Sequence, residues 1–371
     1  MELSAEFPLH PELCYLNHAA VSPWPKRCEQ AIQEFSRENV LWGATHYPKW
    51  MKVESTLRKQ FQTLLNAPSG QDIALVKNTS EGLSMIAYGL KWKAGDTVII
   101  SDEEFPSNRI VWESLRNQGV KVKEIALSGD DPEAAIIAAC DSHTRLISLS
   151  SVQYASGFRL KLEVLGEHCR EQGILFCVDA IQSLGAQNMD VEAIKADFVV
   201  ADGHKWLLGP EGLGVFFSTA EARKQLSVNE YGWHMVEHVG DYDRKDWTVA
   251  QSARRFECGS PNMLATHALS ASLSLLLEVG MKNIEKELEK NVGHLIQQLE
   301  AHPQVTIISA REKERRAGIV TFTHASLSSP ELYQQLMEKQ IICANRGGGV
   351  RFSPHFYTPI NTIDKAVATI P

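Results

Sequence analysis

Through the first two thirds of the chain, short apolar runs alternate with stretches of helical periodicity. The apolar runs are Ile73–Val76, Thr97–Ser101, Val120–Ala126, Thr144–Ser150, Ile174–Asp179, Phe198–Ala201 and Leu213–Ser218. Helical periodicity lies between them in Thr79–Trp92, Ser107–Gln118, Asp131–Ala139, Leu162–Gln172 and Ala180–Gly185. Strands that alternate with helices are typical of a largely parallel sheet covered on both faces. We therefore predict an α/β fold.

The sequence pattern changes near Asn262. Residues 262–300 predict one or two long helices with a break near Gly280 and Asn283. A mixed section follows, with strands expected at Val305–Ser309, Ile319–Thr323 and Val350–Ser353 and a helix at Ser329–Lys339. We predict a large α/β domain at 15–260 and a small α+β domain built from residues 1–14 and 261–371.

The charge balance argues against a polyanion as partner. The formal net charge is -8 at pH 7, whereas nucleic-acid-binding domains are usually basic. The densest basic cluster, within residues 311–316, is interleaved with Glu312 and Glu314 and is typical of a solvated loop or helix end. No apolar segment approaches the roughly 20 residues needed to span a bilayer. We predict neither nucleic-acid nor membrane binding.

Cysteine usage indicates a reducing compartment. The chain has 7 cysteines, an odd number, and no pair has CxxC spacing, so neither a disulfide framework nor a zinc site is expected. The N-terminal residues MELSAEFPLHPEL lack the basic and apolar regions of a signal peptide. These features predict a cytoplasmic protein with no metal site.

The segment Asp202–Leu208 places Lys205 directly after an apolar strand and before a Gly-Pro turn. A buried lysine loses its proton readily because desolvation disfavours the ammonium form. The neutral amine is the nucleophile that forms a Schiff base with a carbonyl group. The alternative is a lysine that extends from a loop into solvent, and this segment alone does not decide between them.

A second segment, Phe176–Gln182, ends an apolar strand with Asp179. Open α/β sheets bind ligands at the carboxyl ends of their strands. A carboxylate there can keep the ring nitrogen of a pyridoxal-5′-phosphate (PLP) cofactor protonated, and Gln182 is close enough to hydrogen-bond the ring hydroxyl. The alternative is that Asp179 only caps a helix.

Two more segments follow strands and precede helices. Thr79 and Ser80 open a helical stretch after Ile73–Val76, where hydroxyls and free backbone N–H groups form a phosphate site. Phe105 follows Thr97–Ser101 and could stack on a cofactor ring. A simple helix cap and a core phenylalanine are the respective alternatives.

In this order along the chain, these residues resemble the class V aminotransferase group of fold-type I PLP enzymes. That group includes cysteine desulfurases, selenocysteine lyases, kynureninases and isopenicillin N epimerase-like proteins. Tyr15–Ala20 with Ser22 and Pro23 is similar to its opening YLDNAA…P motif, Phe256–Asn262 to its FE-x-G-[ST]-P-N turn, and Val350–Tyr357 to its RxSPHFYN ending. The resemblance covers nearly the whole chain.

The resemblance implies roles for the cofactor residues. Lys205 would hold PLP as a Schiff base, Asp179 would pair with the pyridinium nitrogen, and Phe105 would stack on the ring. His204, Thr79 and Ser80 would contact the phosphate. Ser260 would reach the phosphate of the neighbouring subunit, which implies a homodimer with shared active sites.

One position departs from the group pattern. Asp202 stands where many members have a small hydroxyl residue. Because a carboxylate beside a phosphate is repelled, we expect Asp202 to point away or to bond a neighbouring donor.

An amino acid substrate needs a clamp for its carboxylate, and a bidentate arginine suits it. Arg346 and Arg351 are the candidates; alignment with desulfurases favours Arg346, alignment with kynureninases favours Arg351, and we rank Arg346 slightly ahead. By resemblance, Tyr154 lines the substrate pocket, and Asn17 and His18 of the opening motif contact the substrate.

The reaction class stays open at this point. A Lys205 Schiff base leads to a carbanion from which lyase, epimerase or aminotransferase chemistry can follow. Desulfurases and selenocysteine lyases carry sulfur on a mobile cysteine, but the matching stretch Thr323–Pro330 has none, and Cys343 is expected in the core. Desulfuration through a protein persulfide is therefore the alternative reaction rather than the leading one.

Two other classes of protein fit the sequence less well. A regulatory or partner-binding relative of the fold would have no need to keep Lys205, Asp179 and Thr79 together. A nucleotide-binding Rossmann enzyme requires a glycine-rich loop after its first strand, whereas Gly347–Gly349 lies near the C-terminus. A PLP enzyme that acts on an amino acid is the favoured prediction.

Overall fold

The computed structural model describes residues 3–371 and contains one large sheet and two small ones. The strands of the large sheet are β2 (Ile73–Val76), β3 (Thr97–Ser101), β4 (Lys121–Ile125), β5 (Thr144–Ser150), β6 (Leu175–Asp179), β7 (Phe198–Asp202) and β8 (Gly214–Ser218). Their order is β2-β8-β7-β6-β5-β3-β4. β8 is antiparallel to both neighbours, and the rest of the sheet from β7 to β4 is parallel. The predicted α/β fold with a largely parallel sheet is confirmed.

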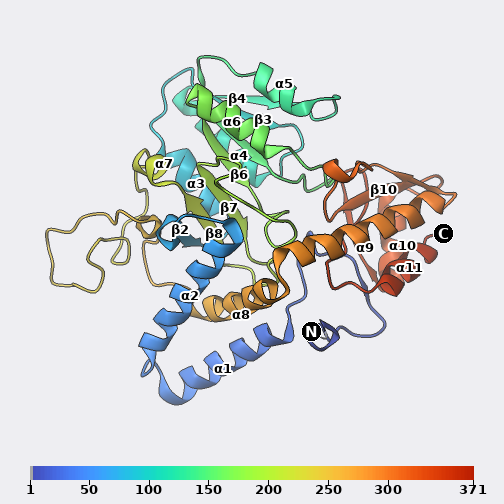
Figure 1. Cartoon of the computed structure of the whole chain (residues 1–371), viewed down its shortest axis with the longest axis horizontal. Coiled ribbons are helices and arrows are strands. Elements are labelled where there is room, and N and C mark those ends of the chain that lie inside the picture. The colour runs from blue at the N-terminus through green and yellow to red at the C-terminus, as the bar shows by residue number, and fades with distance from the viewer. Residues whose placement is uncertain (1–2) are drawn as a thin grey trace.

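Helices cover both faces of this sheet (Figure 1). They are α2 (Tyr47–Leu65), α3 (Thr79–Gly89), α4 (Ser107–Glu113), α5 (Pro132–Ala138), α6 (Leu162–Gln172), α7 (Ala220–Lys224) and α8 (Met263–Val279). Helix α1 (Lys26–Trp42) packs on α8 instead. The central strand β6 is buried on both sides: Phe176 and Val178 join one core cluster and Leu175 and Cys177 the other. A strand buried on both faces has to be apolar throughout, which explains the continuous apolar runs.

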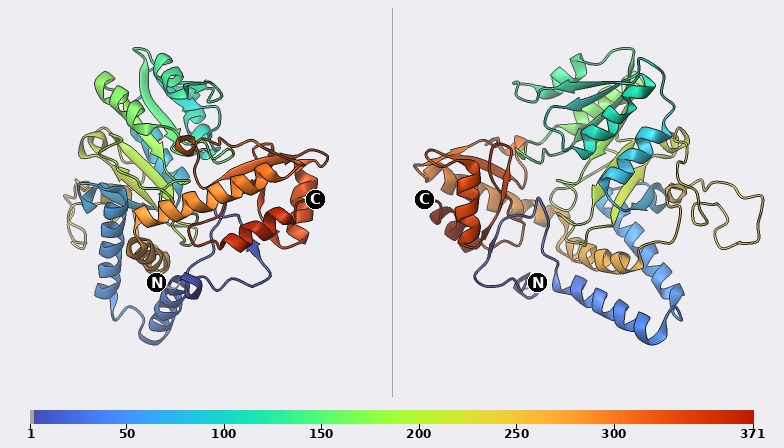
Figure 2. Two further views of the ribbon diagram at one scale, coloured as in Figure 1. Left: turned by 45° about the vertical axis from the view of Figure 1, so that its right-hand side comes forward. Right: turned by 180° about the vertical axis from the view of Figure 1, so that it is seen from behind.

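The C-terminal section combines helices with a small sheet. It contains α9 (Met281–Ala301), α10 (Ser329–Glu338), α11 (Ile360–Ala368), and the strands β9 (Val305–Ile307), β10 (Val320–His324), β12 (Ala344–Arg346) and β13 (Gly349–Phe352) in one antiparallel sheet. The N-terminal arm crosses to this section (Figure 2), where β1 (Cys14–Tyr15) pairs in parallel with β11 (Ile341–Ile342). Residues of the arm therefore share the C-terminal core.

The division into two domains remains a prediction, and core packing favours a later boundary. α8 packs on α1 and α2, and Leu269 and Leu273 belong to the core of the large sheet. Ile284 still belongs to that core, whereas Leu288 belongs to the C-terminal one. We therefore expect the boundary inside α9 rather than at residue 261.

One predicted helix is wrong. Residues 180–185 form turns, because the Asp179 side chain accepts a hydrogen bond from the Ile181 backbone N–H and Leu184 enters a bridge with Gln187. Gly185 has φ +94, and a Cβ there would lie 2.4 Å from the Trp206 carbonyl oxygen. Only glycine fits this backbone, so the chain turns after Asp179 instead of continuing as a helix.

Among residues 3–371 no helix is by itself long and apolar enough to cross a membrane. α8 and α9 satisfy the length and composition criteria only as a pair, with an 83° bend between them.

Candidate active site

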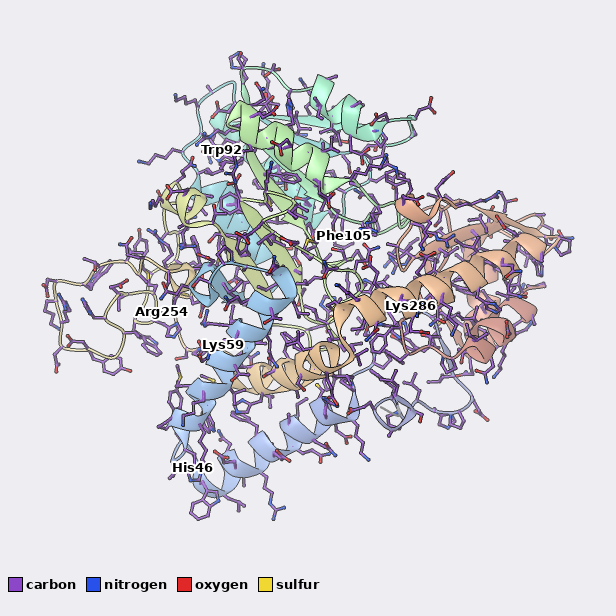
Figure 3. The ribbon with its side chains drawn as sticks, viewed as in Figure 1. His46, Lys59, Trp92, Phe105, Arg254 and Lys286 are labelled. Atoms are coloured by element: carbon purple, nitrogen blue, oxygen red, sulfur yellow. The ribbon has the colours of Figure 1, made fainter. Side chains whose placement is uncertain are left out.

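The chemistry-bearing side chains meet in a pocket of about 280 Å³ at the carboxyl ends of the parallel strands. Sheet order explains the meeting, because β3, β5, β6 and β7 lie side by side and each is followed by a polar segment. The lining residues are Ala19, Ala20, Val21, Asn78, Thr79, Ser80, Phe105, Ser107, Tyr154, Asp179, Ile181, Gln182, Asp202, His204, Lys205, Glu211, Arg346 and Arg351. A larger groove of about 580 Å³ runs along α9 beside Lys286, away from Phe105 (Figure 3), but it contains none of these groups.

Lys205 is 8% exposed, and its Nζ lies 5.7 Å from the centre of the Phe105 ring. Burial lowers the pKa of Lys205 to about 8, and Arg351 acts in the same direction, while Asp179 opposes it. The neutral amine that a Schiff-base lysine requires is therefore far more abundant near physiological pH than it would be for a lysine with the usual pKa of 10.5.

Asp179 is 1% exposed and accepts a hydrogen bond from the Ile181 backbone N–H at 3.0 Å. Burial raises the pKa of Asp179 to about 7. A carboxyl group in this state is stabilised as the anion by a cationic partner. A protonated pyridine nitrogen would be such a partner.

The beginning of α3 offers a phosphate site. Asn78 caps the helix by accepting from the Glu81 backbone N–H, and the Oγ1 of Thr79 is buried without a hydrogen-bond partner among residues 3–371. Ser80 donates to Ser107 at 2.8 Å. An unpartnered hydroxyl at a helix N-terminus fits the phosphate of PLP.

Asp202 and His204 lie together at the end of β7. The Asp202 carboxylate accepts from the Gly203 backbone N–H at 2.8 Å, and its Oδ1 lies 3.2 Å from Nδ1 of His204 without hydrogen-bond geometry. The neighbouring donor expected for Asp202 is thus the backbone N–H of Gly203. His204 lines the pocket beside Lys205.

The two candidate arginines occupy different environments. Arg351 is 2% exposed, donates to the Tyr154 carbonyl oxygen at 2.5 Å, and has an unpartnered Nε. Burial, together with the nearby charge of Arg346, lowers the pKa of Arg351 to about 10. Arg346 is exposed, and its guanidinium donates to the Asn345 carbonyl oxygen at 3.2 Å. The buried guanidinium has no carboxylate partner within residues 3–371 and faces the pocket.

Most of the other predicted residues also reach the pocket. Tyr154 meets the Phe105 ring edge-on at a centroid distance of 5.1 Å. Gln182 lines the pocket, donates to the Ala19 carbonyl oxygen and accepts from the Trp206 indole. One amide hydrogen of Gln182 therefore remains for a ligand.

Asn17, His18 and Ser260 do not line the pocket. Both ring nitrogens of His18 are engaged, with the Ser353 carbonyl oxygen and the Tyr357 hydroxyl, and burial lowers its pKa to about 4. The backbone of Asn17 forms a bridge with Ser353, and its buried Oδ1 has no hydrogen-bond partner among residues 3–371. Ser260 is exposed, outside the lining. Because neither Asn17 nor His18 lines the pocket, substrate contacts by these two residues stay predictions.

Sequence reasoning missed Glu104, which holds the aromatic wall in place. This buried carboxylate accepts from the Ser101 hydroxyl, the Asn108 amide, and both the backbone N–H and hydroxyl of Ser150. Its neighbour in the sequence is Phe105. The acidic run Asp102–Glu104 contains no signal that singles out Glu104, because only the fold buries it. Glu211, at the pocket edge, was also missed.

Fold and site together define a fold-type I PLP enzyme. The chain belongs to the class V aminotransferase family, whose model, Aminotransferase class-V, matches residues 14–364. This family uses PLP, so the predicted family, cofactor and enzyme class are confirmed.

The chain is also similar over most of its length to proteins named as cysteine desulfurases. A probable cysteine desulfurase of Pyrococcus abyssi is 29% identical over 387 residues, which cover 98% of this chain and 94% of that protein. A probable cysteine desulfurase of Methanothermobacter thermautotrophicus is 28% identical, with 96% and 93% covered.

Solved structures agree on the fold. The apo cysteine desulfurase from Thermococcus onnurineus NA1 has a TM-score of 0.87 at 25% identity, with 99% of this chain and 96% of that chain covered. The cystine C-S lyase C-DES, in complex with its reaction product cysteine persulfide, has a TM-score of 0.90 at 22% identity and covers 98% of each chain.

Proposed function

We propose that this chain is a PLP-dependent lyase that cleaves the bond between Cβ and a sulfur substituent of an amino acid. The observation that carries the proposal is a pocket with an arginine ready for a carboxylate and no cysteine in its lining. The relatives named as cysteine desulfurases and the C-S lyase C-DES support a sulfur-containing substrate. A reaction that needs no sulfur carrier on the protein fits this lining best.

The cysteines of the chain support elimination over persulfide formation. Cys343, three residues before Arg346, is buried, and burial raises its pKa to about 12, whereas a nucleophilic cysteine must be a thiolate. Arg346 and Arg351 are separated only by residues 347–350, which form the turn of the β12–β13 hairpin and the beginning of β13. This turn has no cysteine that could reach the substrate.

The pocket residues would have different roles in this reaction. Arg351 would bind the substrate carboxylate, and Phe105 and Tyr154 would wall the cofactor and substrate. When bound, PLP supplies an electron sink for the bond broken at Cα. Lys205 Nζ, as the neutral amine, takes the proton from Cα while the electron pair of the Cβ–S bond leaves with sulfur. With one water consumed, a cysteine S-conjugate yields pyruvate, ammonium and a thiol or persulfide.

The products discriminate between the lyase and a desulfurase. The holoenzyme is incubated with cysteine, cystine and S-alkyl cysteines, and pyruvate, alanine and sulfur species are quantified. A lyase forms pyruvate, whereas a desulfurase forms alanine and leaves a persulfide on the protein, detected by alkylation and mass spectrometry. Alanine as the main product, or loss of turnover in a Cys343→Ser variant, would show the lyase proposal to be wrong. Lys205→Ala is the inactive control, and borohydride should trap the cofactor on Lys205.

We also infer that the protein is a homodimer in the cytoplasm. The exposed position of Ser260, outside the pocket of its own chain, leaves it available to a neighbouring subunit, as the family resemblance implies. The cysteines are all free, which supports a reducing compartment.

A further inference from the structure

Away from the pocket, three buried side chains from distant parts of the sequence converge. They are Glu54 of α2, His234 in the long connection between α7 and Ala253, and Glu257, which follows the short helix Ala253–Phe256. Their exposed fractions are 4%, 3% and 8%. One potential ligand atom of each lies within 4.8 Å of the others.

The cluster has more negative than positive charge. Arg58 contacts Glu54 at 2.5 Å and Glu257 at 2.6 and 2.7 Å. Two carboxylates and one guanidinium leave a net charge of about minus one when the imidazole of His234 is neutral, and an uncompensated buried charge is costly. The cluster therefore favours the binding of a cation.

Two buried atoms in the cluster have no hydrogen-bond partner within residues 3–371: Oε2 of Glu54 and Nδ1 of His234. Nδ1 lies 3.8 Å from Oε2 of Glu257, beyond the roughly 3.2 Å limit of a normal hydrogen bond. A proton on His234 would add the charge but would leave both atoms unpartnered. A metal ion about 2.0–2.2 Å from each ligand spans such gaps and satisfies both atoms.

We propose that Glu54, His234 and Glu257 bind one divalent metal ion of the zinc type. One imidazole nitrogen with two carboxylate oxygens is a ligand set that zinc accepts. Arg58 hydrogen-bonds the opposite oxygen of Glu54 and both oxygens of Glu257. Ligating carboxylates are ordinarily held by such outer contacts.

The position of the cluster gives the metal a structural role. The connection from 225 to 252 has no helix and no named strand and projects from the molecule (Figure 1). His234 lies at its base, where its backbone contacts Cys258 and Arg254; Arg254 and Lys59 mark this side in Figure 3. The metal would fasten this connection to α2 and to the turn that carries Ser260.

The test begins with wild-type holoenzyme freed of metal by a chelator that is then removed. Zinc chloride is titrated by calorimetry, metal content is measured by elemental analysis, and melting is followed by circular dichroism. We expect one zinc ion per chain and a higher Tm, with an unchanged PLP absorbance spectrum. Because the PLP spectrum is recorded separately, failure of the metal proposal is distinguishable from failure of the lyase proposal.

Variants locate the site. Glu54→Gln and His234→Gln should each weaken zinc binding by about 100-fold or more, whereas His238→Ala, an exposed histidine of the same connection, and Cys258→Ser should bind as wild type. No zinc binding by wild type would overturn the proposal. So would equal affinity of wild type and Glu54→Gln, which would assign the zinc to surface groups, or an unchanged Tm with Nδ1 of His234 protonated in the NMR spectrum.

Discussion

At the scale of single residues, burial brings two opposite groups toward neutrality. The pKa of Asp179 rises to about 7 and that of Lys205 falls to about 8, in each case chiefly because of desolvation. An acid and a base whose pKa values are both shifted, and which lie in the same pocket, are typical of a catalytic site. Both groups would find partners in bound PLP: Asp179 would pair with the ring nitrogen, and the Lys205 amine would react with the aldehyde.

Asp179→Asn should change the pH dependence of stability in the cofactor-free protein. The folded pKa of Asp179, about 7, lies above the unfolded value near 3.8, so the stability contributed by the protonated group is present at low pH and lost as pH rises toward 7. We expect the variant to gain Tm over wild type at pH 8 and to match it near pH 4. Thermal melts between pH 4 and pH 8 test this expectation. The same difference in Tm between the two proteins at every pH would contradict it.

The loading of PLP should depend on the pKa of Lys205. Because that pKa is lowered to about 8, the neutral amine accumulates as pH rises through 8, and the rate of PLP incorporation into cofactor-free protein should rise and then level off near pH 9. A lysine with the usual pKa near 10.5 would give an incorporation rate that is still rising at pH 9. Stopped-flow absorbance measures the rate, and Lys205→Ala provides the blank.

Arg351→Lys should raise KM far more than Arg346→Lys. A buried charge-assisted bidentate contact contributes about 2–3 kcal/mol, so we expect about a 30- to 150-fold increase in KM for Arg351→Lys and only a few-fold increase for Arg346→Lys. This order reverses our sequence-based ranking. Steady-state kinetics with the best substrate from the product assays decide it, and a larger effect at Arg346 would restore the first ranking.

At the scale of elements, short turns after the strands position the pocket walls. The turn Gln153–Gly157 follows β5 and carries Tyr154, closed by a hydrogen bond from the Gly157 N–H to the Gln153 carbonyl oxygen. Gly157 has φ +73, and a Cβ there would lie 2.5 Å from the Ile319 carbonyl oxygen. The turn thus packs directly against the C-terminal section.

Gly157→Ala should therefore destabilise the protein and disturb substrate binding. Left-handed φ and a backbone clash together cost about 1–3 kcal/mol, and a shifted turn moves the carbonyl oxygen of Tyr154 away from Arg351. We expect a lower midpoint in urea and a raised KM. Gly129→Ala is the matched control, since nothing lies within 4 Å of a Cβ at Gly129; equal effects at both positions would exclude this explanation.

At the scale of the whole molecule, the active site lies where the sheet meets the C-terminal section. Lys205 and Asp179 come from the large sheet, whereas Arg346 and Arg351 come from the small sheet and Ala19–Val21 from the N-terminal arm. The arm is held by the β1–β11 pair. Substrate binding therefore depends on the relative placement of all these parts.

A mixture of two inactive variants should recover activity if sites are shared between subunits. Lys205→Ala removes the amine, and Ser260→Asp places a negative charge where the partner's cofactor phosphate would lie. A heterodimer of the two has one intact site, so co-refolding should recover about a quarter of wild-type activity by random pairing. Recovery is measured by pyruvate formation. Its absence from a verified heterodimer would place Ser260 in its own subunit's site.

Much of this protein was determined by local sequence. Period and length of the apolar runs specified the strands of the large sheet, and residues at strand ends, Asp179 and Lys205 above all, were found because a polar side chain directly after an apolar strand must lie at the sheet edge. The break between the two long helices was also predictable, because a glycine inside a helical stretch is a local signal for a helix end. Because the carboxyl ends of parallel strands meet at one edge of the sheet, the sequence alone was enough to predict that Asp179 and Lys205 lie in one pocket.

Tertiary structure decided what depends on contacts between distant residues. Burial of Arg351 but not Arg346, the engagement of both His18 nitrogens, and the turn at 180–185 packed against Trp206 all arise from parts of the chain far apart in sequence. The same holds for Glu54, His234 and Glu257, which no spacing connects. Periodicity records which face of an element is apolar, but the partner of each side chain is set only when the elements pack.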